Sequence, residues 1–242
     1  MARNIYWSFV KEFLLYSMIG FIMAFVSSLW IMLGLVNEAA SFLGRSRDNW
    51  LGLFGSYFVH KNWSHLLSNT LSYMFFTFLA FVYSSWLRDH PLIGWKTWNL
   101  IEIVLMPIIG IFDLYSTDIY SFITSSTGMS DFVLSIGIGS LTIICYDEFK
   151  NDGRIFKFFK SRFLRFVWIL LMYVLFVERC RVSLFSSGTN IFAHMSGIIS
   201  GTIVYMIVFT LLKKDFRLIL KLFIIFLSII ISIWYVNVIY KA

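Results

Sequence analysis

Charged residues are scarce in this 242-residue chain: they make up 14% of it, whereas 59% is hydrophobic. A soluble domain of this length is usually about half apolar and about a quarter charged. The shortage of charge therefore argues against an ordinary soluble domain. Repeats, low-complexity tails and linkers are also lacking, so we expect a single transmembrane domain over residues 1–242, with a core at about 11–212 and an extra C-terminal helix at about 218–240.

Cysteine is almost absent, with two residues in the whole chain. Neither Cys145 nor Cys180 has a spacing typical of metal ligands. Cys145 ends the fourth apolar run described below and Cys180 follows the fifth, which would put them on opposite faces of a membrane. A disulfide between them is therefore not expected.

The hydrophobic residues are concentrated in seven runs, and a membrane span needs roughly 20 mainly apolar residues. The runs cover residues 13–36, 66–87, 98–112, 128–145, 163–177, 191–212 and 218–240. Lipid offers the backbone no hydrogen-bond partner, so each run should be helical. We expect an all-α polytopic membrane protein, a helical bundle with about seven transmembrane helices. The first run is too long for a cleaved signal peptide and is expected to be an uncleaved anchor.

Lysine and arginine are distributed unevenly between the segments that join these runs. With the N-terminus inside, six of the 20 basic residues fall outside, and the other 14 fall inside. The six are Arg45, Arg47, Lys61, Arg179, Arg181 and Lys241. Basic residues favour the cytoplasmic side, so we expect a multi-pass cell-membrane protein with a cytoplasmic N-terminus and an outer C-terminus. Attraction to anionic lipid explains the net charge of +7, and we expect the lipid bilayer rather than nucleic acid as its partner.

Polar residues gather at the start of the second run, in the stretch HKNWSHLLSN at residues 60–69. His65 and Asn69 are four residues apart and share one face of a helix. The second, fourth and sixth runs all cross in the same direction, so their first turns should lie at one depth. Ser130 begins the fourth run and His194 begins the sixth, so three distant segments bring polar groups to one layer. Polar groups inside a membrane are costly and usually functional.

Small residues accompany these polar groups. Gly197 and Gly201 lie within about 60° of His194 around a helix, and Gly137 lies on the face of Ser130. Each feature alone has an ordinary explanation, because serines and small residues commonly serve helix packing in membranes. Together they predict that the fourth and sixth runs pack through these glycines, close enough for a hydrogen bond between Ser130 and His194.

The three motifs HKNWSHLLSN, GMS and AHMSGIISG, in this order and on these runs, resemble the rhomboid family of intramembrane serine proteases. The match covers roughly residues 49–205, and the seventh run resembles the form of the fold with one helix after a six-helix core. The matching residues are His60, His65, Asn69, Gly128, Ser130, Ala193, His194, Gly197 and Gly201.

The resemblance implies a serine endopeptidase that cleaves single-span membrane protein substrates near the outer membrane face and needs no cofactor or metal. Ser130 would be the nucleophile and His194 its base. Asn69, His65 and the backbone N–H of Ser130 would form the oxyanion hole. His60 would be a supporting residue, and Gly128 would let the chain bend before the nucleophile.

The composition of the loop at residues 185–190, FSSGTN, suits a lid above His194. Two positions depart from the family pattern. Asp131 stands where glycine or alanine is usual, and its side chain should point away from the Ser130–His194 pair. Leu134 stands where an aromatic residue is frequent.

Two alternatives have different chemistry. A non-catalytic rhomboid-like protein would bind membrane clients, but such proteins have typically lost the serine or the histidine. A zinc-binding membrane protein or transporter would use His60, His65 and His194. Two of these histidines are five residues apart, off the helical i, i+4 spacing, and no carboxylate or cysteine completes the site.

Overall fold

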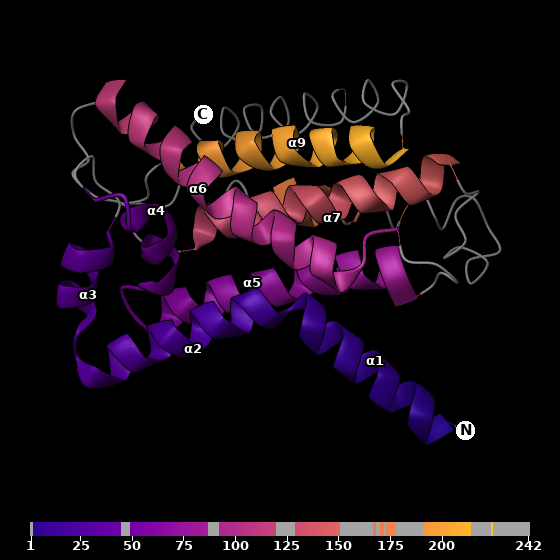
Figure 1. Ribbon diagram of the computed structural model, residues 1–242, viewed down its shortest axis with the longest axis horizontal. Coiled ribbons are helices and arrows are strands. Elements are labelled where there is room, and N and C mark those ends of the chain that lie inside the picture. Colours follow the sequence, from indigo (N-terminus) through magenta and orange to yellow (C-terminus); the bar gives the residue numbers. More distant parts are fainter. Residues whose placement is uncertain are drawn as a thin grey trace.

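The computed structural model describes residues 2–44, 49–86, 92–119, 129–150, 167, 170–171, 173–177, 191–213 and 224. Apart from a one-residue bridge at Asn49, the regular elements in these residues are helices (Figure 1). The all-helical prediction is confirmed for this part of the chain. The helices are α1 Ala2–Tyr16, α2 Met18–Leu33, α3 Val36–Leu43, α4 Gly52–Gly55, η1 Ser56–Phe58, α5 Trp63–Phe81, the π-helical η2 Val82–Trp86, α6 Trp95–Ile119, α7 Ser130–Lys150 and α9 Ile191–Lys213.

Two of these helices, Trp63–Ser85 and Trp95–Phe112, are long and apolar enough to cross a membrane. A third is counted if α1 and α2, which meet at a bend of 65°, form one broken span. The apolar parts of α7 and α9 are shorter, Ser130–Ile144 and His194–Val208. The helices thus suit a membrane protein. The seventh expected run lies outside the described residues except for Ile224, and seven of the 15 residues of the fifth run do too.

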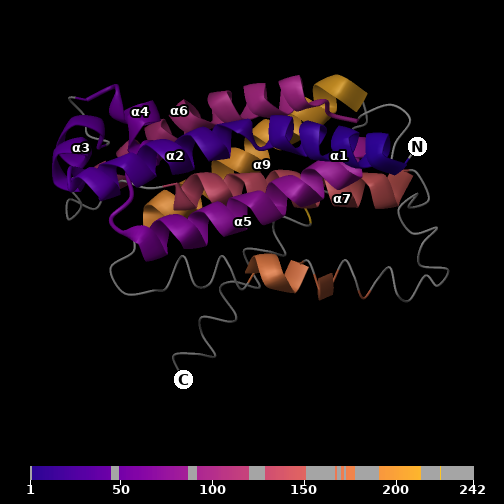
Figure 2. The same ribbon diagram turned by 90° about the horizontal axis from the view of Figure 1, so that it is seen from below.

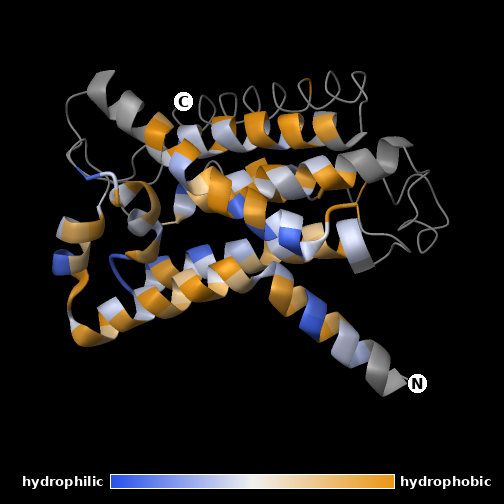
Figure 3. Cartoon of the chain, viewed as in Figure 1, coloured by the Kyte–Doolittle hydropathy of each residue, from blue (hydrophilic) through white to orange (hydrophobic). Residues whose placement is uncertain are grey.

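Helix α7 is the centre of the bundle, with α5 and α9 on either side of it (Figures 1 and 2). Every residue from 131 to 144 is buried. A helix that is apolar on all faces belongs in a protein core or in lipid, and here the neighbouring helices cover this part of α7. Apolar residues also run along the outer helices (Figure 3). Several of them are exposed on the protein, such as Phe25 of α2, Leu71 of α5 and Leu211 of α9, and they give the bundle a surface suited to lipid.

Helices α7 and α9 run parallel and in a fixed register. A Cβ atom built on Gly197 would meet the carbonyl oxygen of Asp131 at 2.1 Å, and one on Gly201 would meet Cα of Ser135 at 2.8 Å. Both pairs are offset by the same number of residues, which only parallel helices allow. The Ser135 hydroxyl also donates to the carbonyl of Gly197 at 2.5 Å. Gly197 and Gly201 therefore lie in the close contact that the sequence predicts for them.

The prediction for Gly137 is wrong. A Cβ on Gly137 would meet the rings of Phe176 at 2.4 Å and Phe76 at 3.2 Å, so this glycine faces α5 and residues 173–177. Gly139 takes the expected place against α9, since its Cβ would lie 2.1 Å from the ring of Tyr205. Neighbours cover α7 on all sides. A glycine in its sequence therefore predicts that a neighbouring segment packs closely there, but not which segment it is.

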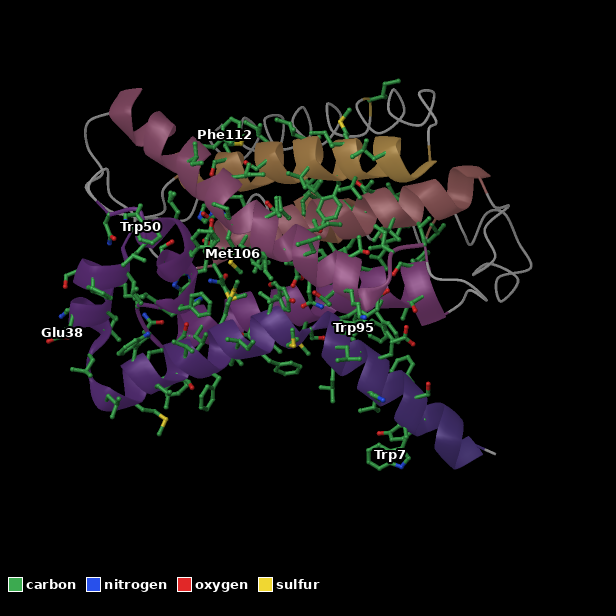
Figure 4. All side chains as sticks on the ribbon, in the orientation of Figure 1. Trp7, Glu38, Trp50, Trp95, Met106 and Phe112 are labelled. Carbon is green, nitrogen blue, oxygen red and sulfur yellow. The ribbon has the colours of Figure 1, made fainter. Side chains whose placement is uncertain are left out.

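The first expected span, residues 13–36, is not one straight helix. Helix α1 ends at Tyr16, at a bend of 65° to α2. Its second half packs on α5, where the rings of Phe9 and Phe81 are 5.1 Å apart. Its first half projects from the bundle, with Trp7 near the free end (Figure 4). At the bend the Asn99 amide donates to the carbonyl of Leu15 at 2.8 Å. A side chain that takes over a backbone partner is a common cause of helix kinks, and here the partner comes from α6.

The long segment expected outside the membrane, residues 37–64, carries α3, α4 and η1 at the end of the bundle where α5 and α7 begin (Figure 1). Phe42 and Trp50 on it are 66% and 70% exposed. The Tyr57 hydroxyl anchors this segment to the bundle, because it donates to the carbonyl of Met106 at 2.8 Å.

Candidate functional site

The first turns of α7 and α9 place Ser130 and His194 at nearly the same level. Gly197 lies opposite Asp131, so the parallel register sets His194 about two residues before the level of Ser130. At 1.5 Å of rise per residue, the axial offset is roughly 3 Å. Ser130 is the first residue of α7 and is half-buried, and His194 is 6% exposed.

Asp131 follows the serine and is almost fully buried. One oxygen of its carboxyl group accepts a hydrogen bond from the backbone N–H of Phe132 at 2.8 Å. The first N–H groups of a helix lack partners within it, and the helix dipole favours an acidic group there. This contact explains how a carboxyl group is accommodated in an apolar layer. Whether its side chain points away from the Ser130–His194 pair stays a prediction.

Helix α5 begins directly after the loop that contains His60. Asn62 is its N-cap residue, with an extended backbone, and its side-chain oxygen accepts from the N–H of His65 at 2.9 Å. Asparagine is among the best N-cap residues because its oxygen replaces a missing helical acceptor. The cap fixes where α5 starts, and so fixes His65 on its first turn and Asn69 on its second.

His60 is fully buried between α2 and α5. Its Nδ1 lies 2.8 Å from the hydroxyl of Ser27, and its Nε2 lies 3.3 Å from the amide nitrogen of Asn69. The rings of His60 and His65 are 5.2 Å apart. Asn69 and His65 therefore both face His60, which confirms that they share one side of α5.

The charge state of His60 follows from its surroundings. Burial, and to a lesser extent the nearby His65, lowers the pKa of His60 to about 3. A neutral imidazole has one donor and one acceptor. Since the Asn69 amide nitrogen is a donor, Nε2 accepts from it, and Nδ1–H donates to Ser27. One neutral histidine thus fixes the Asn69 side chain relative to α2.

Some predicted features are not described. Gly128 and the suggested lid at residues 185–190 lie outside the described residues. The hydrogen bond between Ser130 and His194 stays a prediction, as do the oxyanion roles of Asn69, His65 and the Ser130 N–H. In the part of the chain that the structure describes, no three histidine, cysteine, aspartate or glutamate side chains gather as metal ligands.

Sequence reasoning missed three polar residues near this layer and beneath it. Ser27 is an ordinary serine in an apolar helix, and nothing in its local pattern marks it as a partner of His60. Tyr73 and Glu102 are both buried, and the tyrosine hydroxyl donates to both carboxyl oxygens, at 2.8 and 3.0 Å. Glu102 had a visible signal, because a carboxyl group inside an apolar run is expensive and needs a partner.

Comparison with known proteins adds no relative. No family model matches this chain, and neither a curated protein nor a solved structure matches it.

Proposed function

We propose that this chain is an intramembrane serine endopeptidase of the rhomboid type, with Ser130 as nucleophile and His194 as general base. The observation that carries the proposal is the parallel, glycine-lined contact between α7 and α9. It brings the first turns of two helices to one level, with a serine on one and a buried histidine on the other.

The chemistry needs only these two side chains and water. His194 takes the proton of the Ser130 hydroxyl as its oxygen attacks the carbonyl carbon of the substrate. The proton then passes to the leaving nitrogen as the peptide C–N bond breaks. Water then attacks the resulting ester and gives a proton to His194. The proton passes to the Ser130 oxygen as the ester C–O bond breaks and the second product leaves. No step uses a metal or an organic cofactor.

The negative oxygen that forms during the attack needs donors held in place beforehand. In this proposal the donors are Asn69, His65 and the backbone N–H of Ser130. The contacts of His60 with Ser27 and Asn69 support the role of Asn69, because they hold its side chain in place. One such donor contributes roughly 3–4 kcal/mol to transition-state stabilisation in other serine hydrolases.

The proposed setting is a cell membrane, with the N-terminus in the cytoplasm, the C-terminus outside, and the starts of α5, α7 and α9 at the outer face. Hydrolysis there has access to water. The substrates are single-span membrane proteins, cut close to that face.

Replacement of the nucleophile tests the proposal. Purified protein should cleave a single-span model substrate in detergent, and Ser130→Ala should abolish cleavage without changing the melting temperature. A fluorophosphonate probe should label the wild type and leave Ser130→Ala unlabelled. Ser41→Ala, at an exposed serine of α3, is the matched control and should behave as wild type.

Cleavage that survives in Ser130→Ala at the wild-type level would refute the proposal. If the wild type neither cleaves nor labels but captures the single-span protein, and Ser130→Ala captures it equally, the chain is a non-catalytic client-binding protein instead.

A further inference from the structure

A buried hydrogen-bonded pair, Tyr73 of α5 and Glu102 of α6, lies within the bundle and has no part in the proposed chemistry. Both side chains are fully buried, and the phenol donates to both oxygens of the carboxyl group. A Cβ on Gly20 of α2 would lie 2.0 Å from the Tyr73 ring. The ring is therefore held between a glycine on one helix and a carboxyl group on another.

Tyr73 connects this pair to the start of α7. Its ring stacks on Phe132 with centroids 6.2 Å apart and planes within 15°. Phe132 is two residues after Ser130, and Tyr73 is one helical turn after Asn69. The same side chain thus touches α7 next to the proposed nucleophile and belongs to the helix that carries the proposed oxyanion donor.

Helix α6 also reaches the opposite side of α7. Trp98 lies four residues before Glu102, on the same face of α6. Its ring centroid is 5.9 Å from that of Tyr205 on α9, and Tyr205 fills the space over Gly139 of α7. One face of α6 therefore contacts both α5 and α9, the two helices that enclose α7.

We propose that Glu102 is a positioning residue: through Tyr73 it sets how the start of α7 lies against α5, and so where Ser130 lies relative to Asn69. The consequence for catalysis rests on the proposed function, whereas the consequence for packing does not. The effect depends on the hydrogen bond between Tyr73 and Glu102, because this bond holds the Tyr73 ring in place and Phe132 stacks on that ring.

The test compares Tyr73→Phe, Glu102→Leu and Glu102→Gln with the wild type in detergent. Tyr73→Phe keeps the ring and removes only the hydroxyl. Glu102→Gln keeps an oxygen that can accept from Tyr73, and Glu102→Leu does not. The control is Tyr16→Phe, which also removes a buried hydroxyl. The hydrogen-bond partners of that hydroxyl, Ser84 and the carbonyl of Ile93, do not belong to α7.

Two quantities are measured besides the melting temperature: amide hydrogen exchange of residues 129–136, and the rate of fluorophosphonate labelling at Ser130. Tyr73→Phe and Glu102→Leu should speed exchange of this segment about tenfold, because local opening becomes easier, and should slow labelling several-fold. Glu102→Gln should keep the exchange rate and the labelling rate close to those of the wild type. Tyr16→Phe should lower the melting temperature similarly and leave both quantities unchanged.

Exchange at residues 129–136 in Tyr73→Phe that equals the exchange in Tyr16→Phe would overturn the positioning role. A wild type that the probe does not label would overturn the proposed function alone, and the exchange measurement would still decide the role of Glu102.

Discussion

Asn69 is buried on α5 with its amide nitrogen 3.3 Å from Nε2 of His60. Its proposed role is to donate to the oxyanion, whose charge develops in the transition state and is absent from the bound substrate. Asn69→Ala should therefore lower kcat by roughly 10- to 1000-fold and change KM little. Steady-state cleavage of a single-span substrate measures both constants.

Asn99→Ala is a suitable control for this measurement. Asn99 is also a buried asparagine, but its amide donates to the carbonyls of Leu15 and Trp95, near the bend between α1 and α2. It should cost stability and leave kcat unchanged. A change confined to KM in Asn69→Ala would show that Asn69 contacts the substrate instead.

His60 makes a prediction about pH and stability. Burial lowers the pKa of His60 to about 3, whereas an unfolded histidine titrates near 6.5. Between these values the unfolded chain binds a proton that the folded protein does not, so the free energy of unfolding falls as pH falls. The contribution is fully present above about pH 6.5 and is lost at up to about 1.4 kcal/mol per pH unit below it.

Thermal unfolding in detergent between pH 7.5 and 5 measures this effect. His60→Gln cannot titrate at this position, so its melting temperature should decline less steeply than that of the wild type. The two curves should approach each other as the pH falls. Parallel curves would show that His60 is not held neutral in the folded protein.

At the scale of elements, the contact between α7 and α9 depends on Gly197. A Cβ there would lie 2.1 Å from the carbonyl oxygen of Asp131 and 2.9 Å from its Cα. Backbone atoms cannot rotate away as a side chain can, so the helices must separate. Gly197→Ala should cost about 1–3 kcal/mol of stability and lower kcat/KM at least 100-fold, since Ser130 and His194 would move apart.

Chemical denaturation and cleavage kinetics check this prediction, with Gly94→Ala as the control. A Cβ on Gly94 would meet nothing within 4 Å, so this substitution should be tolerated. Full activity in Gly197→Ala would mean that the close approach of α7 and α9 is not needed for the reaction.

The elements differ in how far their sequences determine them. Apolar runs predict α5, α7 and α9 well, because a long apolar run with few charged residues has few alternatives to a helix. Because these runs should cross the membrane in the same direction, the sequence predicts that Ser130 and His194 lie at one level. The register of Gly197 against Asp131 confirms this level. The rotation of α7 about its own axis was less predictable. Neighbours cover α7 on all sides, so its apolar pattern does not show which face meets which helix, and Gly137 faces α5.

Contacts between distant residues explain what the sequence could not show. The bend after Tyr16 has no proline at it, and its backbone partner, Asn99, is 84 positions from Leu15. The neutral state of His60 depends on burial against α2, where Ser27 is 33 positions away. Such pairings follow from tertiary packing, which local periodicity does not encode.

At the scale of the whole molecule, the proposal requires that the starts of α5, α7 and α9 face outward. The segment before α5 and the segment before α6 should then lie on opposite sides of the membrane, because α5 and η2 connect them. Glu38 and Trp95 mark these two segments, well apart along the bundle (Figure 4). The excess of lysine and arginine in the expected inner segments sets the direction.

Labelling of single cysteines in sealed cells tests this orientation. In a form without Cys145 and Cys180, Glu38→Cys should react with a membrane-impermeant maleimide, whereas Lys96→Cys should react only after permeabilisation. Both native side chains are exposed on the protein, so the membrane alone should cause the difference. The reverse pattern would place Ser130 and His194 near the cytoplasmic face, and substrates would then have to be cut on that side.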